Sequence, residues 1–244
     1  MTADPDTNRR TPDFRDALYS GYVSTFKGTP EPSHVWWDYK YLPLLRDLDR
    51  AAAILEIGCG SGGLLAYLGQ RGFCQARGID VSAEQVQIAL QRGVQAERHD
   101  VFDFLAEHAN GFEGIVAVDV LEHFARQELL QLAPLVIASL KPGGRLLVQT
   151  ANGAGLLPHQ VIYGDLTHLT IFTPESLGQL LRAVGFVDLA FYETGPIPIR
   201  VRGKLDVALW AAIKRVANTV RSIETGKRQV IWTENFICRA FKPA

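Results

Sequence analysis

The sequence predicts an α/β protein built on a doubly wound, mostly parallel β-sheet. The short apolar run Ile54–Ile57 enters a glycine-rich turn, Gly58–Gly63, and a second run ends at Asp80, 22 positions after Gly58. Apolar runs then alternate with helical patterns, as they do in βαβ units. Glycine lets the backbone approach a ligand closely, and a carboxylate can accept two ribose hydroxyls. The region therefore predicts a nucleoside-cofactor site.

The glycine turn fits two cofactor patterns. Gly58, Gly60 and Gly63 match the dinucleotide fingerprint G-x-G-x-x-G. Glu56 and Gly62 also extend the first two glycines to E-x-G-x-G-x-G. The chain argues against a dehydrogenase, because no tyrosine is followed by lysine four residues later and little chain remains for a separate substrate domain.

Five ordered pieces of the chain resemble the class I S-adenosylmethionine (SAM) dependent methyltransferases. They are Glu56–Gly62, Asp80, His99–Val101, Ile115–His123 and Leu140–Val148, and the resemblance covers roughly residues 50 to 190. It implies the seven-stranded, Rossmann-like methyltransferase fold, in which the last strand is antiparallel, and SAM as the cofactor. Within the family, the segment ending in His123 is similar to ubiquinone-biosynthesis O-methyltransferases.

The resemblance also implies which residues hold SAM. The glycine loop would surround the methionine part, Asp80 the ribose, Asp100 and Val101 the adenine, and Asp119 would lie beside the methionine amine. The full implied set is Glu56, Gly58, Cys59, Gly60, Gly62, Asp80, Val81, Asp100, Val101, Asp119 and Val120.

Composition limits the function classes and the compartment. The net charge of −1 gives no overall field that favours nucleic acid. Three cysteines without C-x-x-C spacing argue against a disulfide framework or a zinc site, and Cys59 reads as a small filler in the glycine loop. The start of the chain is not a signal peptide, and no apolar run approaches about 18 residues. We therefore expect a cytoplasmic protein.

The chain divides into five expected segments. They are a disordered tail (1–13), an N-terminal helical lid (14–49), a SAM-binding core (50–195), a basic amphipathic insert (196–228) and the final strand of the core (229–244). Within the lid, His34–Leu48 reads as a helix that packs toward the core. Its aromatic residues, with Tyr22, offer rings for stacking on an acceptor; the expected substrate contacts there are Tyr22, Trp37 and Tyr39.

The second half of the core has clear helix and strand signals. Thr173 followed by Pro174 predicts a helix start, with threonine as N-cap and proline at the first position. Gly185 ends that helix, and Phe186–Tyr192 reads as a strand. Trp232–Phe241 reads as the final, antiparallel strand.

The insert 196–228 carries eight basic residues against two acidic ones, so it is locally +6 and the rest of the chain is −7. Leu205, Leu209, Ile213, Val216 and Val220 recur at helical spacing and form one stripe. A basic amphipathic helix suits an anionic membrane surface or a phosphorylated substrate. The alternative is a helix packed on its own domain or on a second subunit, with its charges solvated.

Two histidines are candidates for a general base, because the pKa of histidine lies near neutrality. His123 follows the expected fourth strand and has Glu122 before it; the alternative is that His123 caps the next helix. His168 follows Asp165 in a D-x-T-H block, where the carboxylate could orient the imidazole. The alternative there is a loop held by local hydrogen bonds.

The candidate catalytic set is therefore Glu122, His123, Asp165 and His168, with His159 and Tyr163 as further substrate contacts. The same carboxylates and imidazoles could bind a divalent cation, but a metal is not favoured. The D-x-T-H block also resembles members of the family associated with glycan modification.

The function favoured by the sequence is a SAM-dependent O-methyltransferase acting on a small molecule. The preferred acceptor is a sugar or sugar-containing intermediate, phosphorylated or lipid-linked, and the insert 196–228 offers a peripheral membrane or subunit contact. The alternatives are methylation of a quinone, phenol or other metabolite at O, N or C, and a catalytically silent SAM-binding scaffold. Nucleic acid is not an expected partner, since no Asn/Asp-Pro-Pro-Tyr motif follows the fourth strand.

Overall fold

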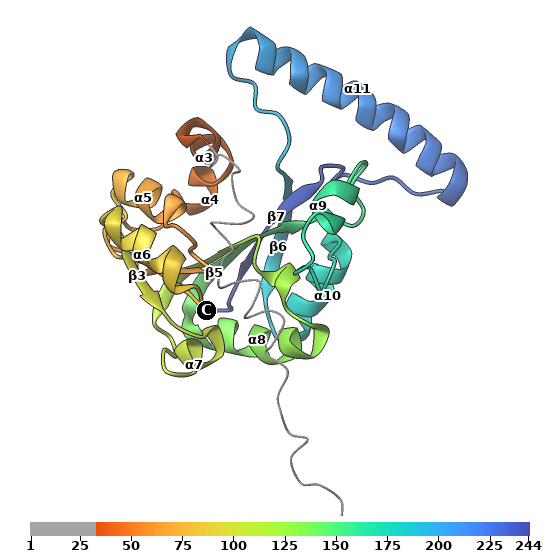
Figure 1. Cartoon of the computed structure of the whole chain (residues 1–244). Coiled ribbons are helices and arrows are strands. Elements are labelled where there is room, and N and C mark those ends of the chain that lie inside the picture. Colours follow the sequence, from red (N-terminus) through yellow and green to blue (C-terminus); the bar gives the residue numbers. More distant parts are fainter. Residues whose placement is uncertain (1–32) are drawn as a thin grey trace, which may run out of the picture.

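The computed structural model describes residues 33–244. The tail 1–13, the beginning of the lid and Tyr22 lie outside the described residues. A seven-stranded sheet in the order β3-β2-β1-β4-β5-β7-β6 forms the centre of the molecule (Figure 1). The strands are β1 (Ile54–Ile57), β2 (Ala76–Asp80), β3 (Gln95–Arg98), β4 (Phe112–Val118), β5 (Leu140–Ala151), β6 (Val187–Glu193) and β7 (Asn235–Phe241).

The register confirms the predicted doubly wound, mostly parallel sheet. Strands β1 to β5 pair in parallel, and β7 runs antiparallel to both β5 and β6. The strand predicted from Phe186–Tyr192 is β6, and the antiparallel strand predicted from Trp232–Phe241 is the shorter β7. Because the carboxyl ends of β1 to β5 meet at one edge, the loops that follow them lie side by side.

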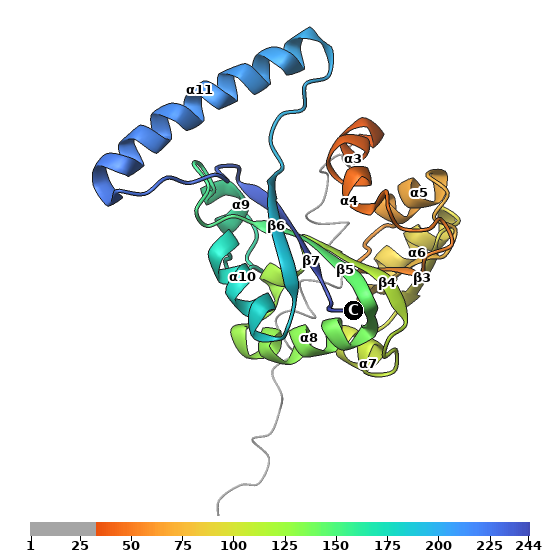
Figure 2. The same cartoon turned by 180° about the vertical axis from the view of Figure 1, so that it is seen from behind.

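Helices cover both faces of the sheet (Figures 1 and 2). They are α3 (His34–Lys40), α4 (Leu42–Leu45), α5 (Gly63–Gln70), α6 (Ala83–Gln91), α7 (Val101–Ala106), the 3₁₀ turn η1 (Leu121–His123), α8 (Arg126–Ser139), α9 (His159–Tyr163), α10 (Pro174–Ala183) and α11 (Arg200–Thr225). Alternate strand residues divide the core: Ile115 packs with α7, α8 and α10, whereas Val116 packs with α3 to α6. This is the period-two pattern of a strand buried on both faces.

The lid segment forms two short helices where the sequence predicted one. Tyr41 separates α3 from α4, and Pro43 lies in the first turn of α4. Proline lacks the backbone N–H that a helix interior uses and is best accommodated in a first turn, so Pro43 favours a new helix start at this point. Trp37 and Tyr41 are buried in the core, which confirms that this segment packs toward the sheet.

The predicted start of α10 is confirmed. The Thr173 hydroxyl accepts a hydrogen bond from the Ser176 amide, and Pro174 occupies the first helical position. The insert forms the helix α11, but within the described chain none of its residues is buried. Among residues 33–244, the apolar stripe of α11 is therefore not packed on the rest of the domain, whereas Trp210, Lys214 and Asn218 of the same helix bond to it. Packing of the stripe on a second subunit stays a prediction.

Candidate active site

The loops after β1 and β2 form the proposed cofactor cradle. The Gly60 amide donates to Asp80 Oδ2 at 2.9 Å, and the Ser82 amide donates to Asp80 Oδ1 at 2.8 Å. The carboxylate therefore holds the glycine loop and the start of α6 in one position. Asp80 is half-buried at the carboxyl edge of the sheet, where a ribose would reach it.

The glycines of this loop are required by conformation and by packing. Gly58, Gly60 and Gly62 all have positive φ, at 65°, 52° and 79°. A Cβ atom on Gly58 would lie 2.5 Å from Val120 Cγ2, so the loop after β1 packs directly on the loop after β4. A Cβ on Gly60 would meet nothing closer than 3.7 Å, so that glycine has open space beside it. A backbone cradle of this kind fits SAM, the cofactor implied by the sequence.

Cys59 is a packing residue within the same loop. Cys59 is 5% exposed, and a Cβ atom added to Gly78 would lie only 2.4 Å from the Cβ atom of Cys59. Burial, with the nearby carboxylates of Glu56 and Asp80, raises the pKa of its thiol far above the ordinary value. A thiol that stays protonated is a poor nucleophile, which supports the filler interpretation.

The expected adenine residues lie at the start of α7. Asp100 is its N-cap, and its Oδ1 accepts a hydrogen bond from the Phe102 amide at 2.8 Å. Val101 is buried in the core, whereas Val81, after β2, is 46% exposed. The contact of Asp100 and Val101 with adenine stays a prediction.

A polar chain links the lid to the loop after β4. The Tyr41 hydroxyl donates to Gln149 Oε1 at 2.8 Å, and Gln149 Nε2 donates to the Asp119 carboxylate at 3.1 Å. Burial, Asp119 and Glu56 together raise the pKa of the Tyr41 hydroxyl well above its ordinary value. Asp119 has a φ of 53°, a conformation that costs about 1–3 kcal/mol for a residue with a side chain. Strain of this size is typical of a binding site.

Glu122 is an acid held inside the protein. It is 1% exposed, and Thr150 Oγ1 donates to its Oε2 at 2.9 Å. Burial and the neighbouring Asp119 carboxylate raise the pKa of Glu122 to about 8. Its backbone carbonyl accepts hydrogen bonds from the Leu169 and Thr170 amides, at 2.8 and 3.0 Å. Glu122 therefore joins the loop after β4 to the loop after β5.

The two candidate histidine loops meet through Thr167. The Thr167 hydroxyl donates to Asp165 Oδ1 at 2.5 Å and lies 2.8 Å from His123 Nδ1. His123 Nδ1 also lies 3.3 Å from the Thr167 carbonyl oxygen, which can only accept. A proton on Nδ1 satisfies both contacts, and a neutral ring in this tautomer carries its lone pair on Nε2. This is the arrangement that a general base requires.

His168 lies beside His123, with ring centroids 4.9 Å apart and planes at 57°. Its Nδ1 lies 3.2 Å from the Ile162 carbonyl oxygen, which likewise places the proton on Nδ1. The structure thus brings His123, Asp165 and His168, from two loops more than 40 positions apart, into one cluster. Glu122 adjoins this cluster through its backbone carbonyl, whereas its carboxylate bonds to Thr150. Among the described residues, no group of three or more His, Cys, Asp or Glu side chains could hold a metal ion.

The expected substrate residues are more scattered. Trp37 is 5% exposed and packs edge-on against Tyr41, with ring centroids 4.5 Å apart. Tyr39 and Tyr163 are 46% and 77% exposed, and His159 is exposed at the start of α9. No bond in the described structure connects these four residues to the histidine cluster.

Sequence reasoning missed four polar residues of this site: Tyr41, Gln149, Thr150 and Thr167. Thr167 carried the clearest signal, because it lies between Asp165 and His168 in the D-x-T-H block. A threonine hydroxyl in such a loop usually bonds to a neighbouring residue of the same loop. The contact of Thr167 with His123, in another loop, could therefore be recognised only from the folded structure.

Proteins with similar sequences are methyltransferases. A family profile described as a methyltransferase domain matches residues 37–190. The mouse mitochondrial ubiquinone biosynthesis O-methyltransferase is 30% identical over 202 residues, which is 63% of this chain and 53% of that protein. The corresponding protein of Xanthomonas axonopodis pv. citri is 36% identical over 107 residues, 41% of this chain and 44% of that protein. The chain spans about half the length of these curated relatives.

Solved structures share the fold. A SAM-dependent methyltransferase from Archaeoglobus fulgidus superposes with a TM-score of 0.67 at 20% identity, covering 91% of this chain and 98% of that chain. The SAM complex of phosphoethanolamine N-methyltransferase 2 from Haemonchus contortus gives 0.62 at 17% identity, covering 96% of this chain and 61% of the other.

Proposed function

We propose that this chain, which belongs to the class I SAM-dependent methyltransferases, methylates a hydroxyl of a small phenol- or quinone-type molecule. The observation that carries the proposal is the hydrogen-bonded series Asp165–Thr167–His123, which fits a neutral His123 with its proton on Nδ1 and its lone pair on Nε2. A hydroxyl acceptor must lose a proton during methyl transfer, and a neutral imidazole can take it.

The cofactor residues are assigned from the cradle described above. SAM, when bound, supplies a methyl group on a sulfonium that a nucleophile displaces in line. Asp80 would accept the ribose hydroxyls, and the loop from Gly58 to Gly62 would contact the methionine part. Asp119, held by Gln149, would lie beside the methionine amine. The enzyme then needs chiefly to position the acceptor hydroxyl.

The acceptor class rests on the relatives and on the surface around the histidines. The curated relatives are named for ubiquinone biosynthesis and O-methylation, which supports the phenol or quinone alternative better than the sugar acceptor favoured by the sequence. Leu166 and Leu169, on either side of the Thr167-His168 pair, are 76% and 50% exposed. Exposed aliphatic side chains beside a site favour an apolar acceptor over a sugar.

The test is methyl transfer by the purified full chain. SAM labelled in its methyl group is incubated with a catechol that carries an alkyl tail, the same catechol without the tail, and a monosaccharide. We expect label on the catechol hydroxyl, with the lower KM for the tailed compound. Label on the monosaccharide alone would contradict the acceptor class, and tight SAM binding without any transfer would contradict the enzymatic role.

The residue roles have a matched control. His123→Gln should lower kcat about 10²- to 10⁴-fold while the Kd for SAM stays within twofold. His108→Gln should leave both unchanged, because His108 precedes β4 at the opposite edge of the sheet, where it stacks on Phe104. Asp80→Asn should weaken SAM binding about 10- to 100-fold, since a charge-assisted hydrogen bond becomes a neutral one.

A further inference from the structure

Helix α11 projects from the body of the protein, beyond the edge of the sheet that carries the active site (Figure 1). It has 26 residues and is therefore about 39 Å long. Extended segments connect it to β6 and β7. In the described chain none of its residues is buried, which is unusual for a helix with a continuous apolar stripe.

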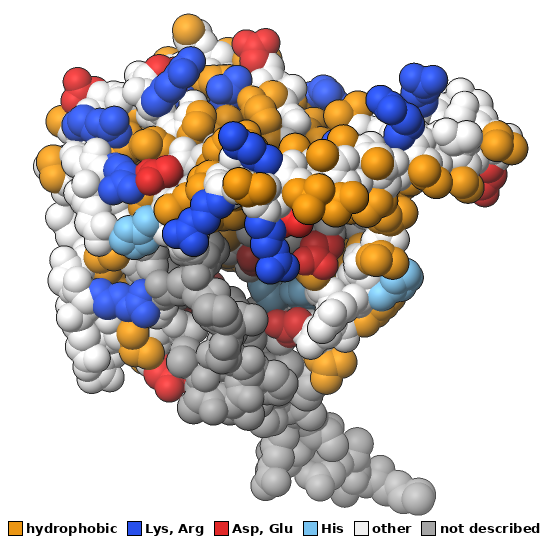
Figure 3. Space-filling view, turned by 90° about the horizontal axis from the view of Figure 1, so that it is seen from above, with side chains coloured by type: hydrophobic (Ala, Val, Ile, Leu, Met, Phe, Trp, Pro, Cys, Tyr) orange, Lys and Arg blue, Asp and Glu red, His pale blue; other side chains and the backbone are white. Residues whose placement is uncertain are grey.

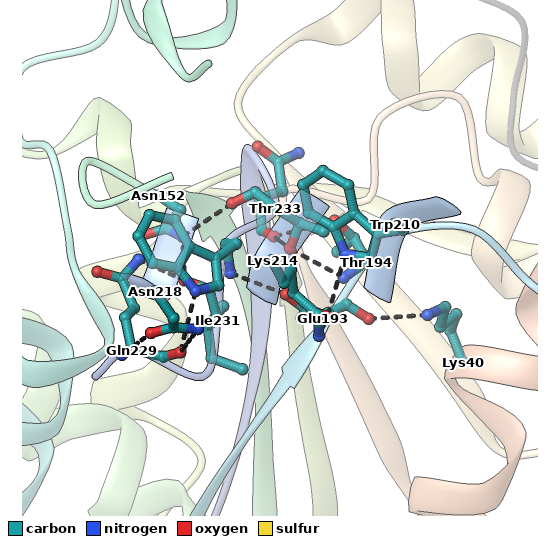
Figure 4. Close-up of polar contacts among 12 residues, drawn as sticks. Lys40, Asn152, Glu193, Thr194, Trp210, Lys214, Asn218, Gln229, Ile231 and Thr233 are labelled. Carbon is teal, nitrogen blue, oxygen red and sulfur yellow. Dashed lines mark hydrogen bonds and ion pairs between the residues drawn. The ribbon is translucent and has the colours of Figure 1, made fainter. Parts of the chain in front are cut away.

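One polar face of α11 holds it to the protein (Figure 4). Trp210 Nε1 and Lys214 Nζ both donate to Glu193 Oε2, at 3.3 and 2.5 Å. One turn further, Asn218 donates to the Gln229 carbonyl oxygen at 3.0 Å and accepts from the Gln229 amide at 2.7 Å. The residues of this face are four apart, so they share one side of the helix. The orientation of α11 is thereby fixed.

The opposite face is aliphatic and directed away from the protein. At 100° per residue, Leu205, Leu209, Val216 and Ile223 lie roughly opposite Lys214 and Asn218. The apolar face consists of Val201, Leu205, Leu209, Ile213, Val216, Val220 and Ile223, each between 45% and 85% exposed. Seen from above, hydrophobic side chains run along this helix with Lys and Arg beside them (Figure 3).

Basic side chains lie along the flank of this apolar face. An open hollow of about 560 Å³ lies between the second half of α11 and the chain that follows it. The basic residues of its lining on this flank are Arg215 and Arg228, together with the hydroxyls of Thr219 and Ser222. Lys214 also lines the hollow, from the attached face, where it pairs with Glu193. Cations and hydroxyls together suit phosphate groups.

The charge of the insert distinguishes between two surfaces that could cover the apolar face of α11, a second copy of this chain and an anionic lipid bilayer. The insert 196–228 is +6, so pairing two copies through the apolar face would bring two such segments together. An anionic lipid surface has the complementary charge, and each basic residue near it contributes about 1 kcal/mol. Among the described residues, no helix is long and apolar enough to cross a bilayer. The observations therefore favour a helix that lies on the surface.

We infer that α11 docks this protein on an anionic lipid bilayer, with its apolar face toward the acyl chains and its basic flank at the phosphates. Docking turns the edge of the sheet that carries the active site toward the bilayer. The inference depends on α11 alone and holds whichever acceptor the enzyme uses.

Co-sedimentation of the full chain with vesicles tests this inference. Phosphatidylcholine vesicles with phosphatidylglycerol should bind the protein at least tenfold more tightly than vesicles of phosphatidylcholine alone, and added salt should weaken the binding. The double variant Leu209→Asp/Val216→Asp should lose at least tenfold in partitioning. Its Kd for SAM should stay unchanged, which shows that the core is folded.

A matched control tests whether the loss of vesicle binding is specific to α11 or follows from any aspartate introduced on the surface. Leu130 lies on α8 and is 64% exposed, so Leu130→Asp makes the same chemical change outside α11 and should leave vesicle binding unchanged. An equal loss in Leu130→Asp, or equal binding to the uncharged vesicles, would overturn the inference. A dimer in solution that Leu209→Asp/Val216→Asp dissociates, without vesicle binding, would assign the face to a second copy and would also overturn it.

Discussion

Glu122 in the active site and Leu209 on α11 both depart from the usual distribution of side chains. The acid is 1% exposed, whereas the leucine is 53% exposed. The chain compensates the buried acid internally, through the Thr150 hydroxyl and a raised pKa that favours the neutral form. In the described chain no such compensation exists for the leucine, since α11 has no buried residue. The protein itself therefore satisfies the buried acid of the active site. The apolar face of α11 can be covered only by a surface outside the described chain.

The largest effect should come from filling the close contact in the cofactor cradle. Gly58→Ala places a Cβ against Val120 in a backbone conformation with positive φ, so we expect it to lower the free energy of unfolding by about 2–4 kcal/mol. SAM binding should be lost with it. Thermal unfolding and SAM titration measure the two effects.

Gly69→Ala is the matched control for this change. Gly69 lies in α5 with no atom within 4 Å of an added Cβ, so alanine there should be neutral or stabilising by up to about 1 kcal/mol. Equal stability of the two variants would show that the Gly58–Val120 contact is not tight in solution.

The second effect concerns the buried acid and pH. Burial raises the pKa of Glu122 in the folded protein to about 8, from an ordinary glutamate pKa of about 4.3 in the unfolded chain. Its contribution to stability is therefore fully present at low pH and is lost as pH rises between those values. Glu122→Gln cannot ionise. The stability of wild type relative to this variant should therefore fall by about 1.4 kcal/mol per pH unit inside that window.

Urea unfolding of both proteins at several pH values from acid to mildly basic gives this difference directly. A difference that does not change with pH across the window would mean that Glu122 keeps an ordinary pKa.

The third effect concerns catalysis rather than stability. Thr167→Val keeps the shape of the side chain but removes the hydroxyl between Asp165 and His123. We expect kcat to fall about 10- to 100-fold through misplacement of the imidazole, with the Kd for SAM unchanged. Thr167→Ser restores the hydroxyl and should recover most of the activity. Steady-state kinetics over a range of pH would reveal an altered apparent pKa of the base, and full activity in Thr167→Val would remove Thr167 from the mechanism.

The smallest effect should come from α11. Leu209→Ala removes an exposed side chain and should change the free energy of unfolding by less than about 0.5 kcal/mol. Leu147→Ala, a change at a fully buried position of β5, should cost about 2–5 kcal/mol. If chemical denaturation gave similar losses for both, the apolar face of α11 would be packed in solution.

The features that the sequence predicted correctly are those decided by local chemistry. The glycine turn follows β1 and Asp80 ends β2, as predicted, and Thr173 with Pro174 identified the start of α10. Helical spacing also predicted that the insert is a helix. Such signals depend on residues close together in the chain.

The features that the sequence did not predict depend on residues that meet only after folding. Thr167 bonds to a histidine 44 positions away, and Gln149 joins Tyr41 to Asp119 across the sheet. Periodicity predicts that α11 has an apolar face but does not say whether the protein covers it. Trp37, expected at the acceptor, packs among other rings because the lid helices use their aromatic residues in the core.

The four tryptophans of the chain are placed outside the sheet. Trp36 and Trp37 lie in α3, Trp210 lies in α11, and Trp232 lies in the segment that returns from α11 to β7. Glu193 accepts hydrogen bonds from the indole of Trp210 and from the backbone amide of Trp232. Intrinsic ultraviolet emission of this protein therefore reports on its lid and on the attachment of α11, so both can be followed optically without a label.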